Sequence, residues 1–198
     1  AVLVDPSGTI LWQGHPSSLT NALVEEAIKG SITTPVYEWG GSAKGIKKAF
    51  LKGNFAKALK EADKLAEDEE LGTEIGVMLR KMVADRVASY EADLERGDVL
   101  KAYDGAKALA SGIKGLPEEE RISALLKAIS KDKAHKAALK AQTKLIEISA
   151  LELRRKKDCD ESIKQLEKLM KGFEGTRTGD LIGEVLKSVQ VKKGKMAR

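Results

Sequence analysis

The side chains best suited to covalent or metal chemistry are one cysteine and two histidines. Cys159 could act as a nucleophile or a metal ligand as its thiolate, and His15 and His135 could act as general bases or ligands. A single cysteine cannot close a disulfide within the chain, and these three residues do not have zinc-finger spacing. We therefore expect neither a dithiol site nor a structural zinc site in this sequence. We assign no catalytic, cofactor-binding or metal-binding residue.

Each of these three residues also has a structural interpretation. Cys159 holds the position of Phe55 and Val99 in two similar segments, which favours a small buried hydrophobic residue, although a helix N-terminus could still activate its thiol. His15 would need a nucleophile or an acid beside it to act as a base. His135 has no partner at four-residue spacing, so we expect a solvated helix residue.

Other catalytic and phosphate-binding motifs do not fit the sequence. The glycine-rich run at residues 40–45 lacks the spacing of a phosphate-binding loop, and no G-x-S-x-G is present. Trp12, Tyr37 and Trp39 are not interleaved with basic residues as in a base-stacking surface. We expect these aromatic side chains to cover the junction between two parts of the chain, and we expect no enzyme active site within these residues.

The net charge of +5 comes from 35 basic and 30 acidic residues. Four basic residues lie in the tail at Lys192, Lys193, Lys195 and Arg198, so the body is close to neutral and nucleic-acid binding is disfavoured. The acidic run 67–70 precedes an expected helix, and the basic run 154–157 is expected to end one, since the helix dipole favours these charges there. Phosphate binding is the alternative for the basic run.

Composition and pattern divide the chain near residue 40. Hydrophobic residues make up 42% and aromatic residues 4%, which favours a folded, mainly helical protein. Val2 to Val4 and Thr9 to Trp12 are two β runs around a Pro–Ser–Gly turn, so residues 2–14 predict a hairpin. A helix with an apolar stripe from Leu19 to Ile28 follows, capped by Ser17 or Ser18. No apolar run is long enough for a membrane span, and we expect no signal peptide.

The first 30 residues resemble the C-terminal part of a thioredoxin-like fold of the TlpA and redoxin type. The resemblance rests on the run VLVDPSGTILWQGHPSSLTNALVEEAIKG, in which a hairpin and a final helix follow one another. It implies that residues 1–30 complete an α/β sheet of a thiol-disulfide oxidoreductase, in a bacterial envelope or periplasm. The family's Cys-x-x-Cys and cis-proline would lie before Ala1, so no catalytic residue is carried over.

A linker at residues 31–41 is expected to separate this unit from a helical domain at 42–190, followed by a basic tail at 191–198. Long helices are predicted at about 70–96, 117–130 and 134–157, within an array of six to eight helices. Three segments superpose without gaps, GNFAKALKEADKLA, GDVLKAYDGAKALA and KDCDESIKQLEKLM. Each has an apolar residue after the corner (Phe55, Val99, Cys159) and a small one three positions later (Ala58, Ala102, Ser162).

These segments resemble the second helices of tetratricopeptide units, in which glycine turns the chain tightly between antiparallel helices. The run FEGTRTGDLIGEVLKSV resembles the closing step of such units in bacterial envelope proteins. The corners are 44 and 60 residues apart, whereas that family repeats every 34 residues. The resemblance implies a mainly α fold, an array of α-hairpins that follows the thioredoxin-like remnant.

Three hypotheses for function follow. In the first, the chain is the C-terminal part of a thiol-disulfide oxidoreductase, and its helical domain binds a protein partner. In the second, the thioredoxin-like unit has no cysteine pair anywhere in the protein, and the chain is a non-catalytic interaction scaffold. The third is a cationic binder of nucleic acid or membrane surfaces, which predicts a steep loss of binding with added salt.

The two predicted strands leave open edges that can pair with another chain. We therefore predict a homodimer formed through the N-terminal hairpin. Sedimentation velocity at micromolar concentration should show dimers, and a monomer as the sole species would contradict this prediction.

Overall fold

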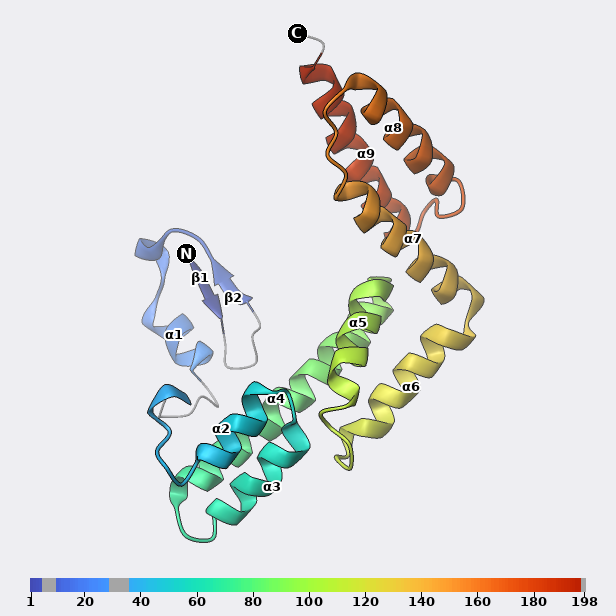
Figure 1. Cartoon of the computed structure of the whole chain (residues 1–198). Coiled ribbons are helices and arrows are strands. Elements are labelled where there is room, and N and C mark those ends of the chain that lie inside the picture. Colours follow the sequence, from blue (N-terminus) through green and yellow to red (C-terminus); the bar gives the residue numbers. More distant parts are fainter. Residues whose placement is uncertain (5–9, 29–35, 197–198) are drawn as a thin grey trace. The chain divides into compact units, whose positions relative to one another are not determined.

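The computed structural model describes residues 1–4, 10–28 and 36–196, and it is mainly helical with one small antiparallel hairpin (Figure 1). The elements are β1 (Val2–Val4), β2 (Ile10–Gln13), the 3-10 turn Pro16–Ser18, α1 (Asn21–Ala27), the 3-10 turn Val36–Glu38, α2 (Lys44–Leu51), α3 (Phe55–Leu65), α4 (Glu70–Glu95), α5 (Val99–Ala110), α6 (Glu118–Lys131), α7 (Lys133–Ser149), α8 (Lys156–Met170) and α9 (Arg177–Lys195). The chain forms two compact units, Ala1–Ser89 with Lys107–Ser123 and Tyr90–Ala106 with Ala124–Arg198, which are described separately.

The N-terminal hairpin has the predicted order of strand, strand and helix. Leu3 pairs with Trp12 across the two strands, and the register shifts between Leu3 and Val4. Helix α1 contacts both strands. Residues 5–9, which contain the predicted turn and the start of the second strand, lie outside the described residues. Val2, Val4 and Ile10 are about half exposed, so the hairpin presents apolar side chains to solvent.

Helices α2 and α3 pack together around a tight corner in the first unit. Gly53 has a φ of +69°, a left-handed conformation that glycine adopts at low cost, and the Asn54 side chain accepts a hydrogen bond from the Lys57 amide. The Phe55 ring meets the Phe50 ring edge-on, with 6.1 Å between centroids. The Arg86 guanidinium lies 5.1 Å from the Phe55 ring centroid. Residues 107–123 join this unit, since the Ala56 amide donates to the Gly112 carbonyl at 2.8 Å.

In the second unit, α8 and α9 lie side by side and both pack on α7 (Figure 1). Their shared core consists of Leu145, Ile148, Leu153, Cys159, Leu166, Ile182 and Val189. Within each helix the core residues are three or seven positions apart, the spacing of one helix face, and Leu153 comes from the segment between α7 and α8. The core therefore follows from the amphipathic pattern of the sequence.

A second repeat runs through residues 97–131 and 157–191 without a gap, at a separation of 60 residues. Gly115 and Gly175 both have positive φ, +82° and +70°. The hydrogen bond that closes each of these turns also recurs. The Leu116 amide donates to the Ile113 carbonyl, and the Thr176 amide donates to the Phe173 carbonyl. Buried residues match in pairs: Val99 and Cys159, Ala102 and Ser162, Ile122 and Ile182, Ile129 and Val189. The pattern of buried residues and the glycine turn between the two helices therefore recur after 60 residues.

Several predicted helix boundaries are wrong. The helix expected at 134–157 is two helices, since α7 ends at Ser149 and α8 begins at Lys156. Asp158 causes the new start, because its carboxylate accepts hydrogen bonds from the backbone amides of Arg154 and Arg155. The basic run 154–157 thus opens a helix instead of closing one. Its adverse interaction with the helix dipole is offset by Asp158, whose pKa is lowered by the hydrogen bond from the Arg155 side chain.

Smaller differences occur at two other boundaries. Thr20 caps α1, not Ser17 or Ser18, because the intervening Pro16–Ser18 segment forms a 3-10 turn. Helix α9 continues to Lys195, so three of the four basic tail residues are helical. Residues 31–35 of the expected linker lie outside the described residues. The acidic run precedes α4 as predicted, and its Glu69 accepts a hydrogen bond from Ser42 at 3.0 Å.

Two glycines in α9 provide a matched test of close helix packing. A Cβ on Gly179 would overlap the carbonyl oxygen of Phe173, whereas one on Gly183 would make an ordinary 3.6 Å contact with Met170 Cε. We predict that Gly179→Ala lowers the free energy of unfolding by about 1–3 kcal/mol. Gly183→Ala should leave it unchanged or raise it by about 0.5–1 kcal/mol, since alanine is the better helix former. Urea denaturation measures both, and equal effects would contradict the assigned packing.

Candidate functional site

Cys159, the only thiol in the sequence, is fully buried in the core of the second unit. Its sulfur lies 4.0 Å from the Met196 sulfur. Phe55 and Val99, which hold the same position in the other two segments, are also buried, at 4% and 1% exposure. The interpretation of Cys159 as a small hydrophobic residue is therefore confirmed. Its place in the first turn of α8 does not expose the thiol to solvent.

The two histidines lie in different units and have local partners. His15 is exposed, and its Nδ1 lies 2.8 Å from the Ser17 hydroxyl oxygen. His135 is in the first turn of α7, where its backbone amide donates to Asp132, a hydrogen bond that lowers the pKa of that carboxyl. The His135 side chain is 36% exposed on α7, which agrees with the expected solvated helix residue, and its Nδ1 atom is buried. Within the described residues, no three His, Cys, Asp or Glu side chains form a metal-binding group.

The structure places the aromatic residues and the basic C-terminal residues in separate places. Trp39 is buried and packs against Phe50 of α2, with ring centroids 6.1 Å apart. Trp12 is half-buried on β2, and the Tyr37 side chain lies outside the described part of the structure. In the C-terminal helix, Lys193 pairs with Asp160 of α8 at 2.5 Å, and this hydrogen bond raises the pKa of Lys193. That lysine therefore stabilises the α8–α9 pair.

The largest of the described surface cavities is an open groove along α7, with a volume of about 930 Å³. Its apolar residues come from two places in the sequence: Leu139 lies on α7, whereas Leu169 and Phe173 come from the end of α8 and the turn after it. All three are partly buried. The groove therefore has apolar side chains that remain accessible to a ligand, the usual character of a binding site.

Lysines line the α7 side of this groove. Lys136, Lys140 and Lys144 follow one another at four-residue intervals, and all three are exposed. Lys144 pairs with Glu147 at 2.9 Å. No carboxylate among the described residues pairs with Lys136 or Lys140. We call Lys136, Lys140 and Lys144 the lysine row.

A second, smaller groove of about 350 Å³ runs beside the first and shares Leu139, Thr143 and Glu147 with it. Its other lining residues are Leu100, Tyr103, Asp104 and Ile146. The Ile146 side chain is 60% exposed. The two grooves are therefore separated by Leu139, Thr143 and Glu147 of α7, with Ile146 exposed beside them.

Gln142 anchors α7 to the rest of the second unit. The side chain is 4% exposed. Its Nε2 donates to the Gly97 carbonyl at 2.7 Å and to the Thr178 hydroxyl at 2.9 Å, and its Oε1 accepts from the Leu100 amide at 2.8 Å. One side chain thus joins α7 to the corner before α5 and to the start of α9.

A salt bridge strengthens the same junction. The Arg177 guanidinium donates to Asp98 at 3.0 Å, which raises the pKa of Arg177. Asp93, at the end of α4, is fully buried and pairs with Arg96 and with Lys101, the latter at 3.2 Å. These polar contacts fix the backbone at both ends of the corner 96–98.

Sequence reasoning did not identify Gln142 or the groove. The four-residue spacing of the lysine row is visible in the sequence, but it is also the ordinary pattern of a solvated helix face. A glutamine in such a helix is usually exposed. Nothing local signals that Phe173, more than 30 positions from Leu139, borders the same groove.

We predict that Gln142→Ala destabilises the second unit, because the Leu100 amide and the Gly97 carbonyl lose a buried partner. The expected loss is about 1–3 kcal/mol in the free energy of unfolding, measured by urea denaturation. Gln190→Ala, an exposed glutamine of α9, is the control and should change it by less than about 0.5 kcal/mol. If both substitutions have the same small effect, Gln142 does not have this anchoring role.

Comparison with known proteins gives no relative from which a function could be transferred. No family model, curated protein or solved structure matches the chain. In the described residues, no helix combines the length and apolar character that crossing a membrane requires. The site must therefore be interpreted from the chemistry of its own residues.

Proposed function

We propose that the helical part of the chain is a non-catalytic docking domain that binds another protein in the groove along α7. The observation that supports this most directly is the accessible apolar surface of Leu139, Leu169 and Phe173 beside a row of exposed lysines. Apolar grooves between helices commonly hold an amphipathic segment of a partner. The Gln142 hydrogen bonds hold α7 in place before a partner binds, which lowers the entropic cost of binding.

A tetratricopeptide-like architecture is part of this proposal. In its support, Gly53 and Gly97 both turn the chain with positive φ between consecutive helices. The small residues three positions beyond the apolar corner residues, Ala58, Ala102 and Ser162, are buried in all three segments. Small residues there let neighbouring helices approach closely. The 60-residue spacing shows that the units are not regular 34-residue repeats.

A second candidate function concerns the N-terminal part. We propose that the hairpin and α1 belong to a thioredoxin-like domain of an envelope thiol-disulfide oxidoreductase, so that the docking domain would bring its substrate or partner to it. The observation in favour is the order β1, β2, α1 together with the exposed apolar residues Val2, Val4 and Ile10, which a larger sheet and its helices would cover.

The docking function predicts that peptides bind in the α7 groove. Peptides selected from a displayed random library on the wild-type chain should bind it with dissociation constants of roughly micromolar order, measured by fluorescence anisotropy. Leu139→Asp should weaken binding by about tenfold or more, because it places a charge on the apolar surface. Ala137→Trp, at an exposed position lining the groove, should do the same by filling it without touching the core.

Leu51→Asp is the matched control, since Leu51 is 68% exposed on α2 and lies outside the groove. It should bind the selected peptides as the wild type does. Circular dichroism confirms that each variant is folded. The proposal fails if no peptide is enriched, or if the selected peptides bind the groove variants and the wild type equally.

A further inference from the structure

We infer that the partner segment in the α7 groove is an acidic amphipathic helix. This inference rests on the proposed docking function and adds the chemistry of the occupant. Two features of the described residues support it, the apolar lining of the groove and the regular spacing of the cations beside it. Each feature restricts the ligand in a different way.

The spacing of the lysine row restricts the shape of the ligand. Residues four apart on a helix are separated by about 6 Å along its axis, so the row extends about 12 Å. A second helix lying along α7 places carboxylates at the same interval when Asp or Glu recurs every fourth residue. Its apolar residues at i, i+3, i+4 and i+7 then face Leu139, Leu169 and Phe173. A helix therefore matches both the cations and the apolar residues.

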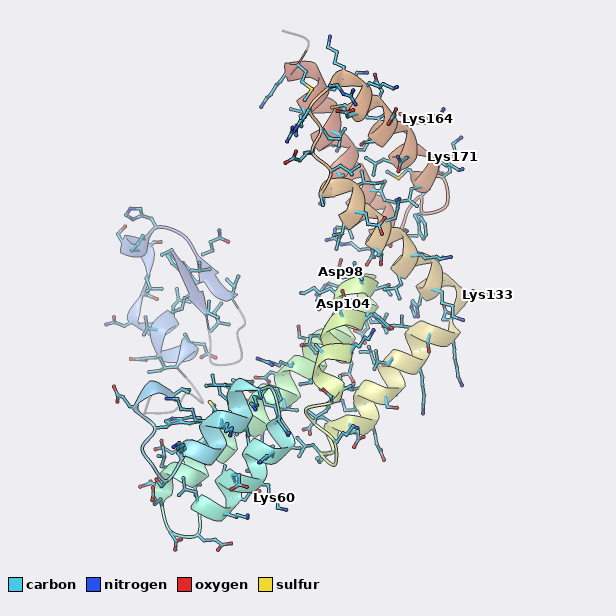
Figure 2. The ribbon with its side chains drawn as sticks, viewed as in Figure 1. Lys60, Asp98, Asp104, Lys133, Lys164 and Lys171 are labelled. Atoms are coloured by element: carbon cyan, nitrogen blue, oxygen red, sulfur yellow. The ribbon has the colours of Figure 1, made fainter. Side chains whose placement is uncertain are left out.

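The charge of the rim restricts the sign of the ligand. Lys136 and Lys140 have no carboxylate partner within the described structure, so their charges are available to a ligand. Lys144 is paired with Glu147. The available positive charge is thus at the N-terminal end of α7, where Lys133 also projects (Figure 2). We expect the acidic residues of the partner to concentrate over that end.

A polyanion such as nucleic acid fits this surface less well. Its phosphates would bind the lysines but would leave the apolar lining uncovered. Asp104 and Glu147 border the adjacent groove and would repel a second row of phosphates. An anionic membrane surface would contact the exposed Ile146 but would leave Leu139, Leu169 and Phe173 uncovered, because these three are partly buried within the groove. An acidic peptide satisfies the lysines and the apolar lining together.

Three synthetic peptides with one apolar face test the inference. Each has about five helical turns, and the polar face carries Glu, Gln or Lys at four-residue intervals. Fluorescence anisotropy with the wild-type chain should show the Glu peptide binding about tenfold more tightly than the Gln peptide, and the Lys peptide binding least. The preference for Glu should shrink with added salt.

Charge reversal locates the effect on the protein. The double substitution Lys136→Glu with Lys140→Glu should remove the preference for the Glu peptide and create one for the Lys peptide. Lys164→Glu with Lys171→Glu is the control, because it makes the same charge change on two exposed residues that do not line the groove, Lys164 on α8 and Lys171 just after its end (Figure 2). The control should keep the wild-type order of affinities.

The outcomes separate this inference from the docking function. If the Glu and Gln peptides bind equally well, and the Lys136→Glu/Lys140→Glu variant binds them as the wild type does, the inference of an acidic helix is wrong but the docking function still stands. If none of the three binds, while peptides selected from the library do, the acidic helix is overturned in the same way. If neither set binds, both proposals fail. Binding of a single-stranded oligonucleotide or of phosphatidylserine-containing vesicles that requires Lys136 and Lys140, without binding of the Glu peptide, assigns the row to another ligand.

Discussion

The hydrogen bonds of the buried Gln142 side chain are the constraint on which the geometry of the second unit depends. Both ends of the amide are satisfied, by Gly97 and Thr178 on one side and by Leu100 on the other. Hydrogen bonds of this kind are strong in a low-dielectric interior and costly to break one at a time. Because Gln142 faces inward, these bonds fix the rotation of α7 about its axis. They thereby determine that the lysine row is exposed and that Leu139, three residues from Gln142, lies partly buried at the edge of the groove.

Close packing at glycine supplies the second constraint. Gly112 lies against the Gly53 carbonyl in the first unit, and Gly179 lies against the Phe173 carbonyl in the second, where no Cβ can be accommodated. In both places a turn is in contact with a neighbouring backbone. The turn before α9 brings Phe173 to the end of α8, where it borders the groove. The position of Phe173 at the groove thus depends on a backbone contact that only glycine at residue 179 permits.

The sequence predicted the features that depend on local signals. Gly53 and Gly97 marked corners, the apolar pattern of residues 70–96 predicted α4, and the buried position of Cys159 followed from its match with Phe55 and Val99. The break at residues 150–155 was missed because Leu, Arg and Lys around it favour a helix, whereas the decisive contact is one carboxylate, Asp158, on two backbone amides. The groove was missed because its sides come from α7 and from residues 169–173. Only tertiary packing brings those together.

Binding of an acidic helix in the α7 groove is tested most directly by NMR, by mapping the changes in backbone amide chemical shift of the isotope-labelled chain during titration with the Glu peptide. We expect the largest shift changes in α7 between Lys136 and Glu147 and in residues 169–173. The Leu100 amide should remain protected from hydrogen exchange by its hydrogen bond to Gln142. Shifts concentrated instead in β1 and β2, or at Lys192 to Lys195 of α9, would contradict this expectation. They would place the binding surface elsewhere on the chain.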